Sequence, residues 1–192
     1  MKDILQNNPE KICKEILTML GNENVNVQLD NNNKSSMYVF LNNTMYISNK
    51  TDNKKSIDEQ NKSKIIVIAH ECAHSIQAKY LQILNFLLAN LEIILFAIVL
   101  VSSIFLKKSS ILLNGYIIVS FLSIIIRWYL EMNATINSVK ITARYMIKNN
   151  VQKESVKDLI GFYKGKLLKT LPIFLLWLFL FKVLRLVLAI VI

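Results

Sequence analysis

The sequence predicts an α+β membrane protein that is mainly α-helical and carries a small antiparallel β-sheet near its N-terminus. Hydrophobic residues make up 53% of the 192-residue chain, and they gather in the C-terminal half, in segments long enough to cross a bilayer. Short runs of alternating apolar and polar residues between residues 25 and 48 are typical of strands. A His-Glu-x-x-His pattern follows, in a stretch predicted to be helical. These observations indicate a single membrane-embedded domain, residues 1–192.

The N-terminal part is expected to contain one helix and the sheet. Asn8, Pro9 and Glu10 form a helix start, because Asn caps a helix, Pro suits its first position and Glu complements its positive end. Gly21 is expected to end this helix, a surface helix that carries Cys13. The strands are predicted at residues 25–29, 37–40 and 45–48, the last two as a hairpin.

The motif helix and the apolar segments follow in order. A capping box, Ser56-Ile57-Asp58-Glu59, is expected to start a zincin-type motif helix that runs to about Tyr80. Residues 1–80 would then be cytoplasmic. Residues 81–130 are predicted to form a transmembrane hairpin, residues 131–170 cytoplasmic helices, and residues 171–192 a third apolar membrane segment. The third segment either crosses the bilayer or lies in its interface.

His70 and His74 are the two histidines of the chain, and both lie in the motif. Helical residues four apart share one face, so the two imidazoles are expected to bind one Zn2+ ion. Glu71, next to His70, would reach a zinc-activated water without ligating the metal, as the catalytic base. The alternative is a helix with two solvated or core histidines and a surface glutamate.

A catalytic zinc ion takes a third protein ligand, and no further histidine remains. Glu131 is the expected metal ligand, because a transmembrane hairpin would return the chain to the side of the motif just before it. Thr135, one turn further, is expected to hydrogen-bond a ligating histidine. The alternative for Glu131 is an interfacial acid that ends a membrane helix. Glu154 and Asp158 are less suitable, because they lie in a basic amphipathic helix.

The two motifs together resemble those of the YugP-like family of membrane-bound neutral zinc metallopeptidases. That family carries His-Glu-x-Gly-His-Ala-x-Gln, two apolar spans and then Glu-x-Asn-Ala-Ser. The matching residues here are His70, Glu71, His74 and Gln77, followed by Glu131, Asn133 and Ala134. Ala73 and Ser75 stand where the family has Gly and Ala. The resemblance implies a zinc-dependent peptidase with the same ligands and the same base.

Charge and cysteine content indicate the compartment. The net charge is +10, and residues 132–170 carry eight Lys and Arg, whereas the opposite turn carries Lys107 and Lys108. This bias predicts a multi-pass protein of the cell membrane whose active site faces the cytoplasm. The basic patch lies between apolar spans, which favours a lipid surface over nucleic acid. Two cysteines give no disulfide framework and suit a reducing compartment; Cys72 should face away from the metal. No signal peptide is visible.

Charged residues also occur inside the apolar segments. Glu92 lies in the first and Lys182 in the third, at similar predicted depth. A lone charge at the centre of a membrane helix costs about 2.5–3.5 kcal/mol on insertion scales. We therefore expect Glu92 to pair with Lys182 or with Arg185. The alternative is that the basic side chains extend to the interface and the third segment lies there.

These residues predict a zinc metalloendopeptidase that hydrolyses a peptide or protein substrate at the cytoplasmic surface of the bilayer. An edge strand at Met45–Ser48 would hold an extended peptide, and Asn133 or Tyr145 would be the candidate oxyanion donors. A second hypothesis is a catalytically idle zinc-binding membrane protein that acts as a partner or regulator. A third is a membrane protein without metal, such as a pore or an immunity factor. Glu71 favours the first, because a purely structural site has no use for it.

Overall fold

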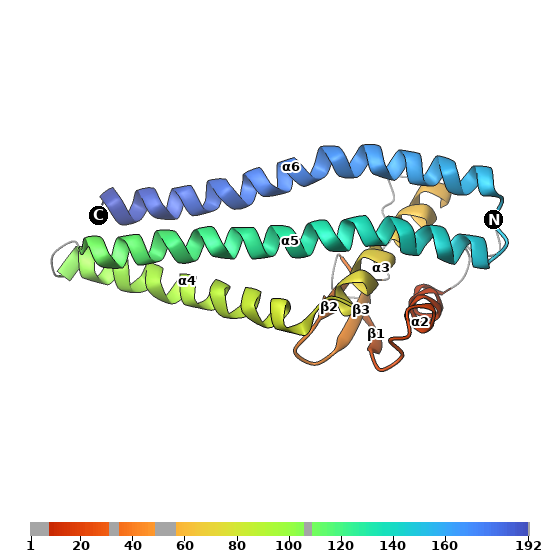
Figure 1. The fold of residues 1–192 in the computed structure, drawn as a ribbon, viewed down its shortest axis with the longest axis horizontal. Coiled ribbons are helices and arrows are strands. Elements are labelled where there is room, and N and C mark those ends of the chain that lie inside the picture. The colour runs from red at the N-terminus through yellow and green to blue at the C-terminus, as the bar shows by residue number, and fades with distance from the viewer. Residues whose placement is uncertain (1–7, 31–34, 49–56, 106–108, 192) are drawn as a thin grey trace. The chain divides into compact units, whose positions relative to one another are not determined.

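The computed structural model describes residues 8–30, 35–48, 57–105 and 109–191. The protein is 77% helical and contains a three-stranded sheet (Figure 1). Its residues form two compact units. The first comprises residues 1–77 and 132–167, and the second comprises residues 78–131 and 168–192. The predicted mainly helical fold with a small N-terminal sheet is confirmed.

The sheet of the first unit is mixed, so the prediction of an antiparallel sheet was wrong. Its strands, β1 (Asn26–Asp30), β2 (Met37–Val39) and β3 (Thr44–Ser48), lie in the order β1-β3-β2. β2 and β3 form the predicted antiparallel hairpin, whereas β1 pairs with β3 in parallel. Alternation of apolar residues tells which face a strand buries but not the direction of its neighbour. The hairpin therefore had a local signal, and the pairing of β1 had none.

The N-terminal helix, α2 (Pro9–Met19), begins and ends as its sequence predicts. The Asn8 side chain accepts a hydrogen bond from the Glu10 amide at 3.0 Å. Gly21 follows the helix with a φ of 68°, a left-handed conformation that glycine adopts without steric cost. The local sequence alone is therefore enough to set both ends of this helix.

The motif helix, α3 (Ile57–Ser75), ends earlier than the predicted Tyr80. The side chain of Asn22 donates hydrogen bonds to the carbonyl and the hydroxyl oxygen of Ser75, each at 3.0 Å. The hydroxyl of Ser75 in turn donates to the Cys72 carbonyl. The carbonyls of Cys72 and Ser75 would accept main-chain N–H groups if the helix continued, and here side chains satisfy them instead. The predicted capping residue Ser56 lies outside the described residues.

The main core of the first unit lies between α2, the sheet and α3. Cys13, Ile16, Met45, Ala69 and Cys72 are among its fully buried members. Cys13 lies on α2, which was expected to be a surface helix. Its side chain is buried, because its face of α2 packs on α3, where its sulfur lies 3.8 Å from that of Cys72. Both cysteines are free thiols.

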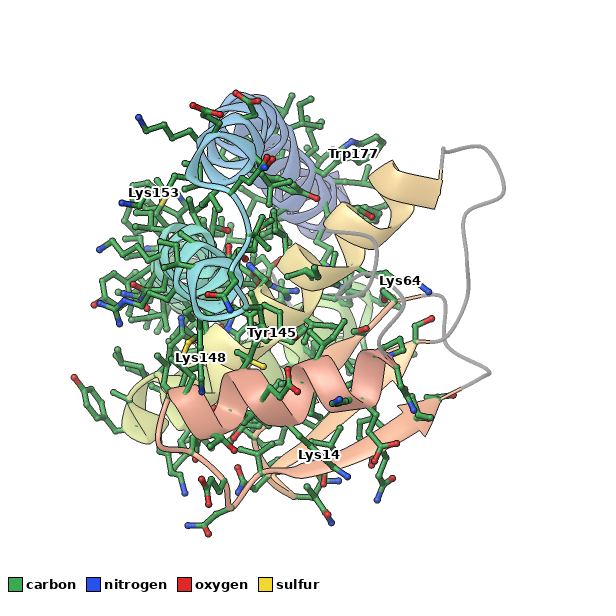
Figure 2. The ribbon with its side chains drawn as sticks, turned by 90° about the vertical axis from the view of Figure 1, so that its right-hand side faces the viewer. Lys14, Lys64, Tyr145, Lys148, Lys153 and Trp177 are labelled. Atoms are coloured by element: carbon green, nitrogen blue, oxygen red, sulfur yellow. The ribbon has the colours of Figure 1, made fainter. Side chains whose placement is uncertain are left out.

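Two long helices contribute the remaining buried side chains of the first unit, the first helix to this core and both helices to a second cluster. Residues 132–148 belong to α5 (Ser110–Lys148) and residues 153–167 to α6 (Lys153–Val191). Tyr145 points from α5 toward α2 (Figure 2), where its hydroxyl donates to Glu15 at 2.8 Å. The predicted amphipathic face after residue 152 is confirmed for Val156, Leu159 and Tyr163, which are buried with Ile66 of α3.

The second unit contains two helices that are long and apolar enough to cross a membrane, by length and composition. These are α4 (Lys79–Phe105) and α5, whose residues up to 131 belong to this unit. Only 11% of the most apolar window of α4 and 17% of that of α5 is buried. The core helix of a water-soluble protein would be mostly buried. The predicted second span and the polar helix after it form one continuous helix, and so do the two C-terminal segments in α6.

The predicted ion pair between apolar segments is confirmed within this unit. Glu92 of α4 is 3% exposed and accepts a hydrogen bond from the ammonium group of Lys182 in α6. The guanidinium of Arg185 lies 3.8 Å from the other carboxylate oxygen. Lys182 also donates to the hydroxyl of Ser123 in α5 at 3.4 Å. The polar side chains of three helices therefore meet around one carboxylate.

Candidate metal centre

The two histidines of the motif aim their ring nitrogens at a common position. The Nε2 atoms of His70 and His74 are 3.2 Å apart, and the ring planes are nearly perpendicular, at 87°. Tetrahedral zinc with Zn–N bonds of about 2.0–2.1 Å separates two nitrogen ligands by about 3.3 Å. The observed spacing of the two nitrogens therefore fits one ion between them.

The packing of α3 decides which side chains line this position. Ala69, Cys72 and Ala73 are fully buried against the core. His70 and His74 fall on the other side of the helix and are half-buried. Residues four apart on a helix are neighbours on its surface, so the spacing and the burial together produce the pair.

Glu131, the predicted third ligand, belongs to the same cluster. One ligand atom from each of His70, His74 and Glu131 lies within 4.8 Å of the others. Among the described residues this is the one group of three or more His, Cys, Asp or Glu side chains with such spacing. Glu131 lies in α5, and the next residue of that helix, Met132, is the first of the residues 132–167 that belong to the first unit. Two imidazoles and a carboxylate are a ligand set that catalytic zinc sites use.

The hydrogen-bond partner of His74 is not the residue that the sequence suggested. The Nδ1 atom of His74 lies 2.9 Å from the Oε1 atom of Gln77. Thr135 is buried, and its carbonyl accepts from Ser138. Thr135 makes no hydrogen bond to either imidazole in the part of the chain that the structure describes. Gln77 reaches the ring because α3 ends at Ser75, and helical spacing gave no sign of that end.

Glu71, the predicted base, is held by the sheet. The main-chain N–H of Tyr38 in β2 donates to the Oε2 atom of Glu71 at 2.9 Å. This bond links the motif helix to the strand beside it. The sequence placed the peptide-binding edge at Met45–Ser48, and that prediction was wrong. These residues form the central strand β3, paired on both sides, so the edge next to the base is β2.

The two candidate oxyanion donors lie in different surroundings. The hydroxyl of Tyr145 is engaged by Glu15, and burial together with that carboxylate raises the pKa of the phenol. Tyr145 therefore belongs to the core rather than to the centre. The Oδ1 atom of Asn133 accepts hydrogen bonds from Gln77 at 3.3 Å and from Asn137 at 3.1 Å. Asn133 thus joins the surroundings of His74.

Cys72 lies between the two histidines in sequence but faces the core, as predicted. Its hydrogen bond with Cys13 and its burial raise the pKa of the Cys72 thiol well above the ordinary value. A protonated thiol is a poor metal ligand. The thiol therefore does not compete with the cluster of His70, His74 and Glu131.

No protein-family model, curated protein or solved structure matches this chain. The assignment of a function therefore depends on the chemistry of the residues described above.

Proposed function

We propose that the protein is a zinc-dependent metalloendopeptidase of the cell membrane whose site faces the cytoplasm. The observation that supports this proposal best is the convergence of two imidazole nitrogens and the carboxylate of Glu131, on a helix in which Glu71 directly follows the first histidine. The third ligand comes from α5, 57 residues beyond His74 (131 − 74). A chance pair of histidines would not be expected to have such a partner.

The residues of the cluster fit the proposed metal. His70 and His74 would bind it through Nε2, and Glu131 through one carboxylate oxygen. A zinc ion bound there supplies a Lewis acid that polarises a peptide carbonyl and acidifies water. Glu71 takes the proton of the attacking water and delivers it to the leaving amine, as a general base and then a general acid. The Tyr38 N–H keeps the carboxylate of Glu71 in place for this proton transfer.

An extended peptide beside β2 is the substrate arrangement that we propose. Among the described strands, β2 pairs with β3 alone, so its other edge is not used by the sheet. That edge lies next to Glu71, because the Tyr38 N–H points to its carboxylate. Main-chain pairing to a strand edge recognises extended peptides with little dependence on their side chains, and here the Tyr38 carbonyl would be the acceptor, because Glu71 already takes the Tyr38 N–H. The site would therefore cleave unfolded segments.

The test uses the full chain in detergent, a peptide library, and a chelator as the first control. We expect cleavage by the wild type that stops on chelation and returns with zinc. Glu71→Gln should bind zinc with the wild-type stoichiometry and cleave nothing, whereas Glu131→Ala should lose zinc. Cleavage by Glu71→Gln, or cleavage that persists with chelator, would contradict the mechanism. Stoichiometric zinc without cleavage of any peptide would favour the catalytically idle alternative.

A further inference from the structure

Three side-chain amides connect the end of the motif helix to α5 and terminate on His74. Gln77 contacts the Nδ1 atom of His74 through Oε1 and donates from Nε2 to the Oδ1 atom of Asn133. Asn137, one turn further on α5, donates from Nδ2 to the same oxygen of Asn133. The four residues belong to the first unit and are half-buried.

The direction of this chain follows from the orientation of Asn133, whose Oδ1 atom faces both neighbouring amides. A carbonyl oxygen only accepts, so the Oδ1 atom of Asn133 obliges both of its neighbours to donate. Gln77 then directs its nitrogen to Asn133 and its oxygen to His74. Because that oxygen also only accepts, the hydrogen of the His74 ring must be on Nδ1. The Nε2 atom of His74 is left with a lone pair directed toward the Nε2 atom of His70, where the proposed metal would be bound.

We propose that Gln77, Asn133 and Asn137 are positioning residues that select the metal-binding tautomer of His74. This inference rests on the proposed metal site. If the three amides were reversed, Gln77 would present its nitrogen to Nδ1 of His74. The ring hydrogen would then be on Nε2, and the lone pair needed for the metal would be lost. The polarity of the amide chain therefore decides whether His74 can act as a ligand.

The early end of α3 is what makes the arrangement possible. The amide of Gln77 donates to the carbonyl of His74 at 3.2 Å, so main chain and side chain of Gln77 both contact the same residue. Asn133 and Asn137 are four apart on α5, which places their side chains next to each other. Two separate helices thus contribute one continuous chain of donors and acceptors, and the orientation of the Asn133 amide sets its direction.

The first measurement needs no substitution. The chain has two histidines, so 15N NMR of the zinc-free protein in detergent contains two ring systems. The spectrum is recorded about two pH units above the ordinary histidine pKa of about 6.5. We expect the hydrogen of His74 on Nδ1 in the wild type. A hydrogen on Nε2 of His74 would overturn the proposal. Zinc is absent, so this result is independent of the proposed peptidase activity.

Zinc affinity, measured by competition with a chromophoric chelator, provides the second readout. Gln77→Leu should weaken zinc binding about 10–100-fold, the usual effect of losing a residue that supports a ligand. Gln77→Glu keeps an acceptor for His74, and Asn133→Asp keeps an acceptor for both donors, so both should bind zinc nearly as well as the wild type. Asn133→Leu should give a mixture of His74 tautomers and intermediate affinity.

Asn149→Leu is the matched control, because Asn149 follows α5 directly but donates to the Tyr145 carbonyl. It should change neither the tautomer nor the affinity. Unchanged zinc affinity in Gln77→Leu, or equal losses in Gln77→Leu and Gln77→Glu, would overturn the positioning role. If the wild type binds no zinc, the proposed function is wrong. The inference about His74 is still tested in that case, because its tautomer is measured by NMR on the zinc-free protein.

Discussion

His70 and His74 converge because small residues before and between them, Ala69, Cys72 and Ala73, are buried. Ala69, Cys72 and Ala73 fix the inward side of α3, and helical geometry then fixes the outward side. The pair follows from spacing, so it could be predicted, whereas the use of Nε2 is seen only in the structure. The role of Gln77 depends on where the helix ends, and that end is set by Asn22, about fifty residues earlier in the chain. No local pattern contains that information.

At the residue scale, the structure predicts the effect of removing one main-chain hydrogen. Tyr38→Pro deletes the N–H that Glu71 accepts. Proline is tolerated on an edge strand when the lost N–H was not used by the sheet, so the fold should persist. A misplaced catalytic group costs up to about 100-fold in rate. We expect peptide cleavage about 10–100-fold slower with zinc stoichiometry unchanged, measured on the purified proteins.

The control for this experiment is Tyr38→Phe. It keeps the N–H and removes only the hydroxyl, which donates to Asn43. Tyr38→Phe should cleave at nearly the wild-type rate. Equal rates for the proline variant and the wild type would show that β2 does not position the base.

At the scale of elements, features that depend on neighbouring residues in the sequence were predicted correctly more often than features that depend on distant residues. Both ends of α2 and the hairpin of β2 and β3 are set by residues next to them in sequence. The parallel pairing of β1 and the early end of α3 are set by distant residues, and both were missed. Glu92 and Lys182 are also distant, 90 residues apart. Their pairing was nevertheless predicted, because the cost of an isolated charge in an apolar segment leaves few partners.

The ion pair predicts how α6 is held in the second unit. Glu92 lies 13 residues from each end of α4 (92 − 79 and 105 − 92), about 20 Å along the helix. Loss of one partner leaves a buried charge uncompensated, which costs about 3–5 kcal/mol. Glu92→Ala should therefore lower the unfolding temperature of the detergent-solubilised protein markedly, measured by circular dichroism.

The exchanged variant Glu92→Lys with Lys182→Glu should recover a large part of that loss, because it keeps opposite charges together. The matched single control is Asn90→Ala, because Asn90 is a polar residue of the same helix whose side chain is exposed and donates to the Phe86 carbonyl within that helix. This control should unfold at nearly the wild-type temperature. Equal stability of Glu92→Ala and the wild type would mean that Lys182 does not depend on its partner.

At the scale of the whole molecule, composition predicts a membrane protein, and the structure contains two helices that are long and apolar enough to cross a bilayer. The basic residues on α5 and α6, including Lys148 and Lys153 (Figure 2), belong to the segment that predicts the cytoplasmic side. The described helices α4 and α5 are apolar and mostly exposed. The orientation of the protein in the bilayer stays a prediction, because the length and hydropathy of a helix do not depend on which of its ends faces the cytoplasm.

A topology reporter tests this prediction. A phosphatase that is active only outside the cytoplasm, fused after Ser109 between the two apolar helices, should be active. The same reporter fused after Asn149, in the polar segment beyond Glu131, should be silent, and a cytoplasmic reporter should give the opposite pattern. Activity at Asn149 with silence at Ser109 would place the cluster of His70, His74 and Glu131 outside the cell and remove the proposed localisation.

The contact between Cys13 and Cys72 has a further consequence. These two sulfurs are the chain's full set of thiols, and both are fully buried where α2 meets the motif helix. A water-soluble alkylating reagent can reach them only when the two helices separate. The rate at which the native protein reacts with such a reagent therefore measures how often α2 separates from the helix that carries the two histidines. This measurement needs no label on the chain.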